Sequence, residues 1–179
     1  MFLDESGFLL APLVRRSWAP CGQTPVLHQR GRHHKKVSAI AALCVSPQRD
    51  QVRLYFRLHP GKDVDTPLAI EFLRILGQEL ETSRCLLWDR LNAHRAKKMA
   101  AYLTTVPHLH TFFLPAYAPE LNPVEYVWSY LKMNPLANVA VPEVHELALR
   151  TRHSGCSLQR KPELLRSFLR HSPLFLRLS

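Results

Sequence analysis

Three acidic residues of this chain lie where strands and helices are expected to run, end or begin. Asp4 lies within an apolar segment, Asp89 ends the run "CLLWD", and Glu125 falls in the first turn of an expected helix. Carboxylates placed close together repel one another and are costly to bury unless a cation neutralises them. Oxygen ligands suit Mg²⁺ or Mn²⁺, and two such ions about 4 Å apart can clamp both oxygens of a phosphoryl displacement. The three acids are therefore candidate ligands of a metal-dependent phosphoryl-transfer site.

Each acid also has an ordinary structural explanation. Asp4 could be a solvated residue of an edge strand, and Asp89 could cap the turn in "DRLN". Glu125 stands three residues after Asn122, which is the spacing of a capping box. Taken singly, each explanation is at least as good as the catalytic one. Together they do not explain why three acids are expected near one edge of a sheet.

The hydrophobic pattern indicates which elements would position these acids. It predicts strands at 1–10, 36–45, 51–59, 84–89 and 108–115, and helices at 65–80, 96–106, 122–132, 142–152 and 161–171. Gly7 is expected to form a turn or bulge, and Asp65 or Thr66 to cap a helix that has Pro67 at its first position. Strands alternate with helices only in the second half, which favours a mixed sheet in an α/β architecture.

Composition narrows the class of protein. The chain has 179 residues with 46% hydrophobic and 21% charged residues, which excludes a disordered tail. Its apolar runs fall short of the roughly 18 residues that cross a bilayer, so no membrane partner is expected. Its 24 Lys and Arg against 14 Asp and Glu give a formal net charge of +10. Nucleic acid or another anionic surface is therefore the expected partner.

The cysteines indicate a cytoplasmic protein, because all four are scattered and the first residues do not form a signal peptide. A zinc site built from Cys21, His33, His34 and Cys44 is conceivable by ligand type. Its spacing matches no zinc finger, and Cys44 falls in an expected buried strand. We expect a core thiol there and assign no metal to cysteine.

A basic loop follows the first expected strand, with Trp18 among its charges. Its cations are Arg15, Arg16, Arg30, Arg32, Lys35 and Lys36. As a group they are expected to bind the DNA backbone without reading sequence. Any one of them could equally be a solvated residue.

The segments "FLDESG", "LLWDRLNAHRA" and "LPAYAPELNPVEYVWSYLK" resemble the D, D, E signature of mariner-superfamily transposases, in the bacterial insertion-sequence branch. The third segment is the most specific, and 84 residues separate Asp4 from Asp89 while 35 separate Asp89 from Glu125. The resemblance implies a ribonuclease-H-like fold, with a mixed sheet of about five strands flanked by helices. It implies a catalytic domain over 1–150 and a C-terminal helical extension over 151–179.

The resemblance also implies residue roles. Asp4, Asp89 and Glu125 would be the catalytic ligands of two Mg²⁺ or Mn²⁺ ions, with Asp4 bridging both. His94 matches the family histidine five residues after the second Asp, and would orient a phosphate or a water, or simply begin the next helix. Lys132 would contact a DNA phosphate or be solvated, and Trp128 and Tyr117 would be core or hydrogen-bonding scaffold. The DNA-binding set is Arg15, Arg16, Arg30, Arg32, Lys35, Lys36, Arg90, His94 and Lys132.

The implied partners are the terminal inverted repeats of a transposable element and its target DNA, bound in the bacterial nucleoid. The chain departs from the family at Arg90, where Asn is common, and it shows no helix-turn-helix module before Asp4. We therefore expect either the catalytic half of a split transposase, with a separately encoded N-terminal half, or a remnant of a decayed element. A homodimer is compatible with either. The alternatives are an inactive DNA-binding remnant and, with less support, a junction-resolving or RNA-hybrid nuclease.

Overall fold

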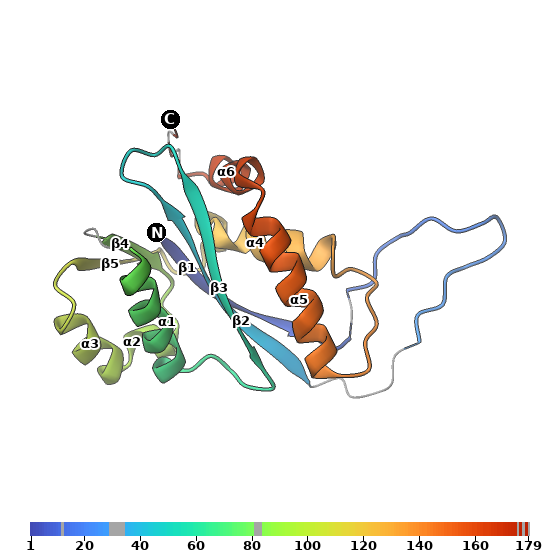
Figure 1. The fold of residues 1–179 in the computed structure, drawn as a ribbon, viewed down its shortest axis with the longest axis horizontal. Helices are drawn as coiled ribbons and strands as arrows, with labels where there is room; N and C mark the ends of the chain where they lie inside the picture. Colours follow the sequence, from blue (N-terminus) through green and yellow to red (C-terminus); the bar gives the residue numbers. More distant parts are fainter. Residues whose placement is uncertain (12, 29–34, 81–83, 175, 177, 179) are drawn as a thin grey trace.

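A five-stranded sheet in the order β3-β2-β1-β4-β5 forms the centre of the molecule (Figure 1). The computed structural model describes residues 1–179 except 12, 29–34, 81–83, 175, 177 and 179. The strands are β1 (Phe2–Leu9), β2 (Lys36–Val45), β3 (Val52–Pro60), β4 (Arg84–Trp88) and β5 (Leu109–Phe113). β1, β2 and β3 pair antiparallel, whereas β4 pairs parallel with both β1 and β5. The prediction of a mixed sheet is confirmed.

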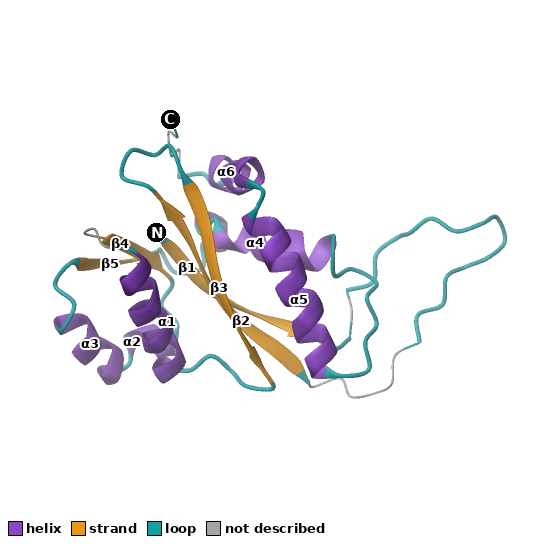
Figure 2. Ribbon diagram, in the orientation of Figure 1, coloured by secondary structure: helices purple, strands orange, loops and turns teal. Residues whose placement is uncertain are grey.

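Helices cover both faces of this sheet (Figure 2). On one side lie α1 (Thr66–Glu79), α2 (Asn92–Arg95) and α3 (Lys97–Thr104). On the other side lie α4 (Val124–Met133), α5 (Val144–Gln159) and α6 (Pro162–His171), and a short 3-10 helix, η1 (Pro119–Leu121), precedes α4. Across the described residues, no helix has both the length and the apolar character needed to cross a membrane.

β1 is an interior strand whose side chains alternate between two separate cores. Phe2 and Phe8 pack with α4, α5 and α6, whereas Leu3 packs with α1 and α3 on the opposite face. The expected bulge at Gly7 is wrong, because Gly7 pairs in register with Ser38 of β2. Successive residues of β1 therefore face opposite sides of the sheet, which decides where its acidic residues point.

The N-terminus of α1 forms as its sequence predicts. The Asp65 side chain accepts a hydrogen bond from the Leu68 backbone N–H at 3.0 Å, and Pro67 follows in the first turn. Phe72, Leu73 and Leu76 are buried against the sheet. This helix fixes the face on which α2 and α3 then pack.

α5 runs seven residues further than the helix predicted at 142–152, ending at Gln159. Gly155 lies inside it, and a Cβ atom there would stand 2.5 Å from the Phe56 ring of β3. The missing side chain therefore allows the helix to approach the strand closely. The boundary expected between residues 150 and 151 falls inside α5, and Leu147 and Leu158 on either side of it belong to one core.

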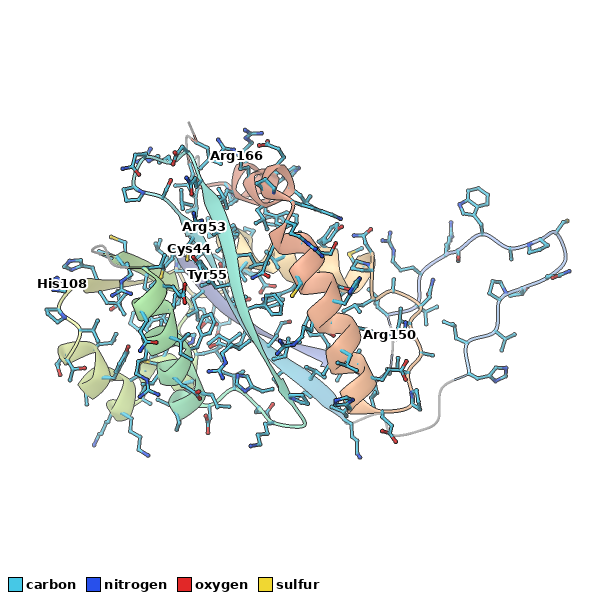
Figure 3. All side chains as sticks on the ribbon, viewed as in Figure 1. Cys44, Arg53, Tyr55, His108, Arg150 and Arg166 are labelled. Carbon is cyan, nitrogen blue, oxygen red and sulfur yellow. The ribbon has the colours of Figure 1, made fainter. Side chains whose placement is uncertain are left out.

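We call the loop at 11–35 between β1 and β2 the basic arm, and its described residues at 13–28 project from the body of the molecule (Figure 1). At its start, Ala11 and Leu13 line a pocket together with the core residues Phe8, Leu136 and Leu147, and Figure 3 shows the side chains along the rest of the described arm. Trp18 is fully exposed, and Val14 and Val26 are each exposed over most of their surface. Arg15 anchors the base of the arm, because its backbone N–H donates to Asn138 Oδ1 at 2.7 Å.

Candidate active site

Asp4 lies in the middle of β1 and faces α4. Only 6% of the residue is exposed, and its Oδ2 accepts a 2.8 Å hydrogen bond from the Trp128 indole N–H. The alternative of a solvated edge residue is therefore wrong. Trp128 is both core and hydrogen-bonding scaffold, as expected, because it also packs edge-on against Phe8.

Asp89 follows directly after β4, where that strand ends beside β1. Its Oδ1 accepts a hydrogen bond from the Leu91 backbone N–H at 3.0 Å and lies 2.9 Å from His94 Nδ1. Its side chain is 43% exposed. Asp89 thus caps the following turn, as the ordinary explanation proposed, and still presents a partly open carboxylate.

Glu125 lies in the first turn of α4 and is exposed. The capping box does not form, because the Asn122 N–H donates to the Pro119 carbonyl at 2.9 Å. Asn122 instead uses its side chain, donating to the Leu3 carbonyl at 3.0 Å and accepting from the Val124 N–H at 3.2 Å. This buried amide ties the start of α4 to β1 and so places Glu125 near Asp4.

The three carboxylates line one cleft of about 500 Å³, which we call the carboxylate cleft. Its other walls come from the turn after β4, from Arg95 of α2, and from the loop between β5 and α4, with these members: Arg90, Leu91, Arg95, Leu114, Pro115, Ala116, Tyr117, Ala118, Pro119 and Asn122. The sequence-predicted acids therefore come together from β1, from the end of β4 and from α4. This is the arrangement expected if the carboxyl end of β4 meets β1.

The electrostatics of the cleft show an excess of negative charge. Burial raises the pKa of Asp4 to about 8, with the charges of Glu125, Glu5 and Asp89 adding to the effect and the Trp128 hydrogen bond opposing it. Burial likewise raises the pKa of Glu125, where the Lys132 charge opposes it and Asp89 adds to it. A cation in the cleft would relieve both shifts.

Asp89 behaves differently from the other two acids. Burial by itself would raise its pKa, but hydrogen bonds from His94 and from the Leu91 N–H outweigh that effect, so the pKa of Asp89 is lowered. It therefore carries its charge at neutral pH. The cleft thus combines one carboxylate with a lowered pKa, Asp89, with two whose pKa is raised, Asp4 and Glu125.

The donor set fits a hard divalent cation, because all three candidate ligands offer carboxylate oxygen. Within the described ranges, however, no group of three or more His, Cys, Asp or Glu side chains is placed to hold a metal ion. The buried Asp4, the half-exposed Asp89 and the exposed Glu125 surround the cleft without forming a finished site. The suggested zinc set has no support either, since Cys21 is exposed on the arm, Cys44 is buried in β2, and His33 and His34 lie outside the described residues.

His94 lies behind the cleft rather than inside it. Its side chain has no exposed surface and stacks on Trp88, with ring centroids 4.3 Å apart. Its Nδ1 lies 2.9 Å from Asp89 Oδ1, and its Nε2 lies 2.9 Å from Glu5 Oε1. Burial lowers the pKa of His94, but the hydrogen bonds to Asp89 and Glu5 raise it to about 10. The predicted contact of His94 with DNA has no support here, because the ring has no exposed surface to present to a phosphate.

Lys132 lies on the Asp4 side of β1. Its Nζ donates to Ser6 Oγ at 2.8 Å and stands 5.6 Å from the centre of the Phe8 ring. Burial lowers the pKa of Lys132, while the charges of Glu125 and Asp4 oppose that shift. The side chain is thus half-buried beside the carboxylates and is not a solvated lysine.

Of the side chains at the rim of the cleft, some were predicted from the sequence and others were not. Arg90 is exposed and stacks 5.7 Å from the centre of the Phe113 ring. Arg95 also lines the cleft, and Glu5 lies behind the cleft in contact with His94. Neither Arg95 nor Glu5 was among the predicted site residues. Tyr117 was expected to be scaffold, but it is fully exposed and has a positive φ of 59°. A bulky residue in the left-handed region is unusual, because its Cβ is crowded there.

The basic arm does not reach the carboxylate cleft in the described part of the chain. Arg15 and Arg16 are exposed, and the Arg15 side chain donates to the Met133 carbonyl at 2.7 Å. Lys35 is exposed, and Lys36 pairs with Asp63. The remaining predicted cations of the arm, Arg30 and Arg32, lie outside the described residues.

Comparisons with solved structures show that this fold is known. The Mos1 mariner paired end complex with Mn is similar, with 17% sequence identity and a TM-score of 0.63, over 98% of this chain and 56% of that one. The Mos1 mariner transposase catalytic domain is similar with 14% identity and a TM-score of 0.56, over 98% and 84% of the two chains. The present chain therefore spans little more than half the length of the Mos1 chain in the paired end complex.

The family is shown by the sequence itself. No curated protein matches the chain. The sequence profile of the family described as "DDE superfamily endonuclease" matches residues 1–148, which include all three carboxylates of the cleft. The mixed sheet flanked by helices, shared with the Mos1 catalytic domain, is a ribonuclease-H-like fold. This chain belongs to the DDE superfamily endonuclease family.

Proposed function

We propose that this chain is the catalytic domain of a DNA transposase, which cuts strands at the ends of a transposable element and joins them to target DNA. One observation carries the proposal: in a DDE-family chain, Asp4, Asp89 and Glu125 come from three separate elements and line one cleft. The similar structures support it, since one is a Mos1 transposase paired-end complex with the left transposon end.

Two Mg²⁺ or Mn²⁺ ions held by Asp4, Asp89 and Glu125 are the proposed cofactors. Bound ions would supply Lewis-acid chemistry, activating the attacking oxygen and stabilising the leaving oxygen. The raised pKa of Asp4 supports this assignment, because burial and neighbouring carboxylates leave the group in need of a cation. Glu125 is exposed in the first turn of α4, so it has the freedom to adjust toward the buried Asp4.

The residues around the ligands would hold the site and the DNA. Trp128 fixes the orientation of Asp4 through its indole N–H, and Lys132 places a positive charge beside Asp4 and Glu125. Arg90 and Arg95 at the rim would bind phosphates on either side of the reacting one. These roles require no covalent intermediate, because position and charge suffice for phosphoryl transfer.

The basic arm would bind the DNA backbone away from the cleft, through Arg16 and Lys35 among its described exposed cations. The net charge of +10 supports a polyanionic partner. The element ends and the target would be this partner in the nucleoid. A second copy of the chain, or a separately encoded half that recognises the inverted repeats, could complete the assembly.

The direct test is nicking of supercoiled plasmid in Mg²⁺ or Mn²⁺, compared between the parent and Asp89→Asn. The substitution keeps the size of the side chain but removes its charge, so we expect cleavage to fall by at least about a hundred-fold, since each metal contact stabilises the transition state by several kcal/mol. Glu163→Gln, at an exposed acid of α6, is the matched control and should cut as the parent does. Equal cleavage by Asp89→Asn and the parent would refute the role of Asp89.

A DNA-binding domain that has lost cleavage is the second candidate. It is favoured by the absence, among the described residues, of a finished ligand set for a metal ion. Thermal unfolding with and without Mn²⁺ separates the two, because a ligand that binds the folded state raises the melting temperature. A rise in the parent that disappears in Asp4→Ala supports the catalytic domain, whereas no rise in the parent supports the inactive one.

A further inference from the structure

Glu5 and His94 form a buried connection behind the carboxylate cleft. Glu5 follows Asp4 on β1, so its side chain points to the opposite face of the sheet. There its Oε1 lies 2.9 Å from His94 Nε2, and its side chain is only 13% exposed. Two adjacent residues of β1 thus lie on opposite faces of the sheet: Asp4 lines the cleft, and Glu5 contacts His94 behind it.

The imidazole of His94 joins Glu5 to Asp89. Its other nitrogen, Nδ1, lies 2.9 Å from Asp89 Oδ1 and 3.2 Å from the Asp89 carbonyl oxygen. The ring lies nearly parallel to the Trp88 indole, at an interplanar angle of 15°, and has no exposed surface. With both nitrogens engaged and one face covered, the ring is held in a single orientation.

The contacts of Asp89 show what this orientation achieves. In the described structure, the contacts that the Asp89 side chain makes with His94 and with the Leu91 N–H both fall on Oδ1. This arrangement turns the carboxylate so that Oδ2 is left for another ligand. A half-exposed carboxylate in a turn would otherwise sample several rotamers, and fixing it costs side-chain entropy.

The burial of Glu5 is also energetically unfavourable, which is unusual for a residue with a purely structural role. Its Oε2 is buried, with no hydrogen-bond partner among the described residues. A buried carboxylate oxygen without a partner is unfavourable and calls for a specific explanation. The charge of Glu5 also disfavours ionisation of its neighbour Asp4. Glu5 therefore has two unfavourable effects at this position: a buried oxygen without a hydrogen bond, and repulsion of the Asp4 carboxylate.

We infer that Glu5 and His94 are positioning residues, which orient the carboxylate of Asp89 for binding a divalent cation. This inference rests on the proposed function, because it assumes that Asp89 is a metal ligand. Glu5 reaches Asp89 through His94, since Glu5 and His94 are in direct contact and Glu5 faces away from α4. Groups that orient a ligand from outside the coordination sphere commonly change metal affinity by roughly ten- to a hundred-fold.

A double-mutant cycle on the dissociation constant of Mn²⁺ tests the inference, with free Mn²⁺ measured by electron paramagnetic resonance. We expect His94→Ala to weaken binding by at least roughly ten-fold, and Glu5→Ala by a similar factor in the parent background. In the His94→Ala background, Glu5→Ala should have an effect below about two-fold, because its route to Asp89 is already lost. Glu5→Gln should stay within about three-fold of the parent, because its amide oxygen accepts the same bond from His94.

The unfolding temperature of each metal-free variant separates positioning from a merely structural role. Single variants that melt lower but bind Mn²⁺ as the parent does would overturn the inference. A full effect of Glu5→Ala in the His94→Ala background would also overturn it, because Glu5 would then act on the ion directly. If His94→Ala does not fold, His94→Asn replaces it, since its amide can still donate toward Asp89 while losing Glu5. Glu5→Ala should then change Mn²⁺ affinity by less than about two-fold in that background.

The parent protein separates this inference from the function on which it rests. A parent that neither binds Mn²⁺ nor nicks plasmid refutes the proposed function and the inference together. A parent that does both, with Glu5 and His94 variants that match it in Mn²⁺ affinity, refutes the inference alone. Glu163→Gln, the exposed acid of α6, is the control for loss of a carboxylate and should bind as the parent does.

Discussion

The carboxylate cleft and the basic arm hold charges of opposite sign in opposite ways. Asp4 in the cleft is 6% exposed and is bound by Trp128, whereas Trp18 in the arm is fully exposed. The cleft is built on a strand and a helix that pack in a core, but the arm projects from the molecule (Figure 1). The negative charges are thus placed by tertiary packing, and the described positive charges of the arm mostly face solvent.

This difference separates two kinds of electrostatic function. In the cleft, burial and neighbouring charges shift the pKa of each acid, so each residue has an individual role that a substitute cannot take over. In the arm, exposed cations interact through a screened field in which one charge can substitute for another. We therefore expect large, specific effects from changes in the cleft, and small, additive ones from changes in the arm.

The largest effect on stability should come from the pH dependence of Asp4. Its pKa rises from 3.8 in the unfolded chain to about 8 in the folded protein, so the folded state holds a proton that the unfolded state has lost. Between these values the free energy of unfolding must fall as pH rises, by at most about 1.4 kcal/mol per pH unit from this group. Asp4→Asn cannot ionise and should lack this component.

Urea unfolding of the metal-free protein at pH 5, 6 and 7 checks this prediction. Asp4→Asn should gain stability relative to the parent as the pH rises, because only the parent must take up a proton at this position on folding. Stability curves that run parallel for the two proteins would show that Asp4 ionises as easily as an exposed carboxyl. Addition of Mg²⁺ should reduce the difference, since a cation stabilises the ionised form in the parent.

Substitution of the buried Trp128 and of the exposed Trp18 compares how much each contributes to the free energy of unfolding. Trp128→Phe removes the N–H donor to Asp4 in a buried setting and should lower the free energy of unfolding by about 1–3 kcal/mol, since an orphaned buried polar group costs that much. Trp18→Phe in the arm should change it by less than about 0.5 kcal/mol, the usual limit for surface positions. Chemical denaturation measures both, and equal losses would contradict the contrast between cleft and arm.

The smallest effect is expected in the arm. Arg16→Ala removes one exposed cation and should weaken DNA binding a few-fold, with the slope of log affinity against log salt decreasing by about one unit if Arg16 contacts a phosphate. Arg170→Ala removes the same charge from an exposed position on α6 and serves as the control. Fluorescence anisotropy with duplex DNA at several salt concentrations distinguishes them. An unchanged slope for Arg16→Ala would show that it makes no phosphate contact.

Much of the fold could be predicted from local patterns. The strands expected at 36–45 and 51–59 and the cap at Asp65 depend on neighbouring residues, and all three appear in the structure. The errors came where distant residues intervene. Gly7 was expected to interrupt β1, but pairing with β2 keeps the strand regular. α5 continues beyond 152 to Gln159, and its Gly155 packs closely against Phe56 of β3.

The candidate site was predictable in part for the same reason. Asp4, Asp89 and Glu125 stand out in the sequence because each acid interrupts or borders an apolar segment. Glu5 gave no such signal, since its importance depends on contact with His94, 89 positions along the chain. Tyr117 was misjudged because nothing local shows that its turn leaves the ring outside the core.

Local chemistry alone therefore determined the order of strands and helices, the positive charge and the three acids, because each depends on residue type and short spacing. The three-dimensional packing decided which side of β1 each acid faces, which histidine orients Asp89, and how strongly Asp4 resists ionisation. Those properties depend on desolvation and on charges brought together across the sheet. Such contacts exist only once the chain has folded.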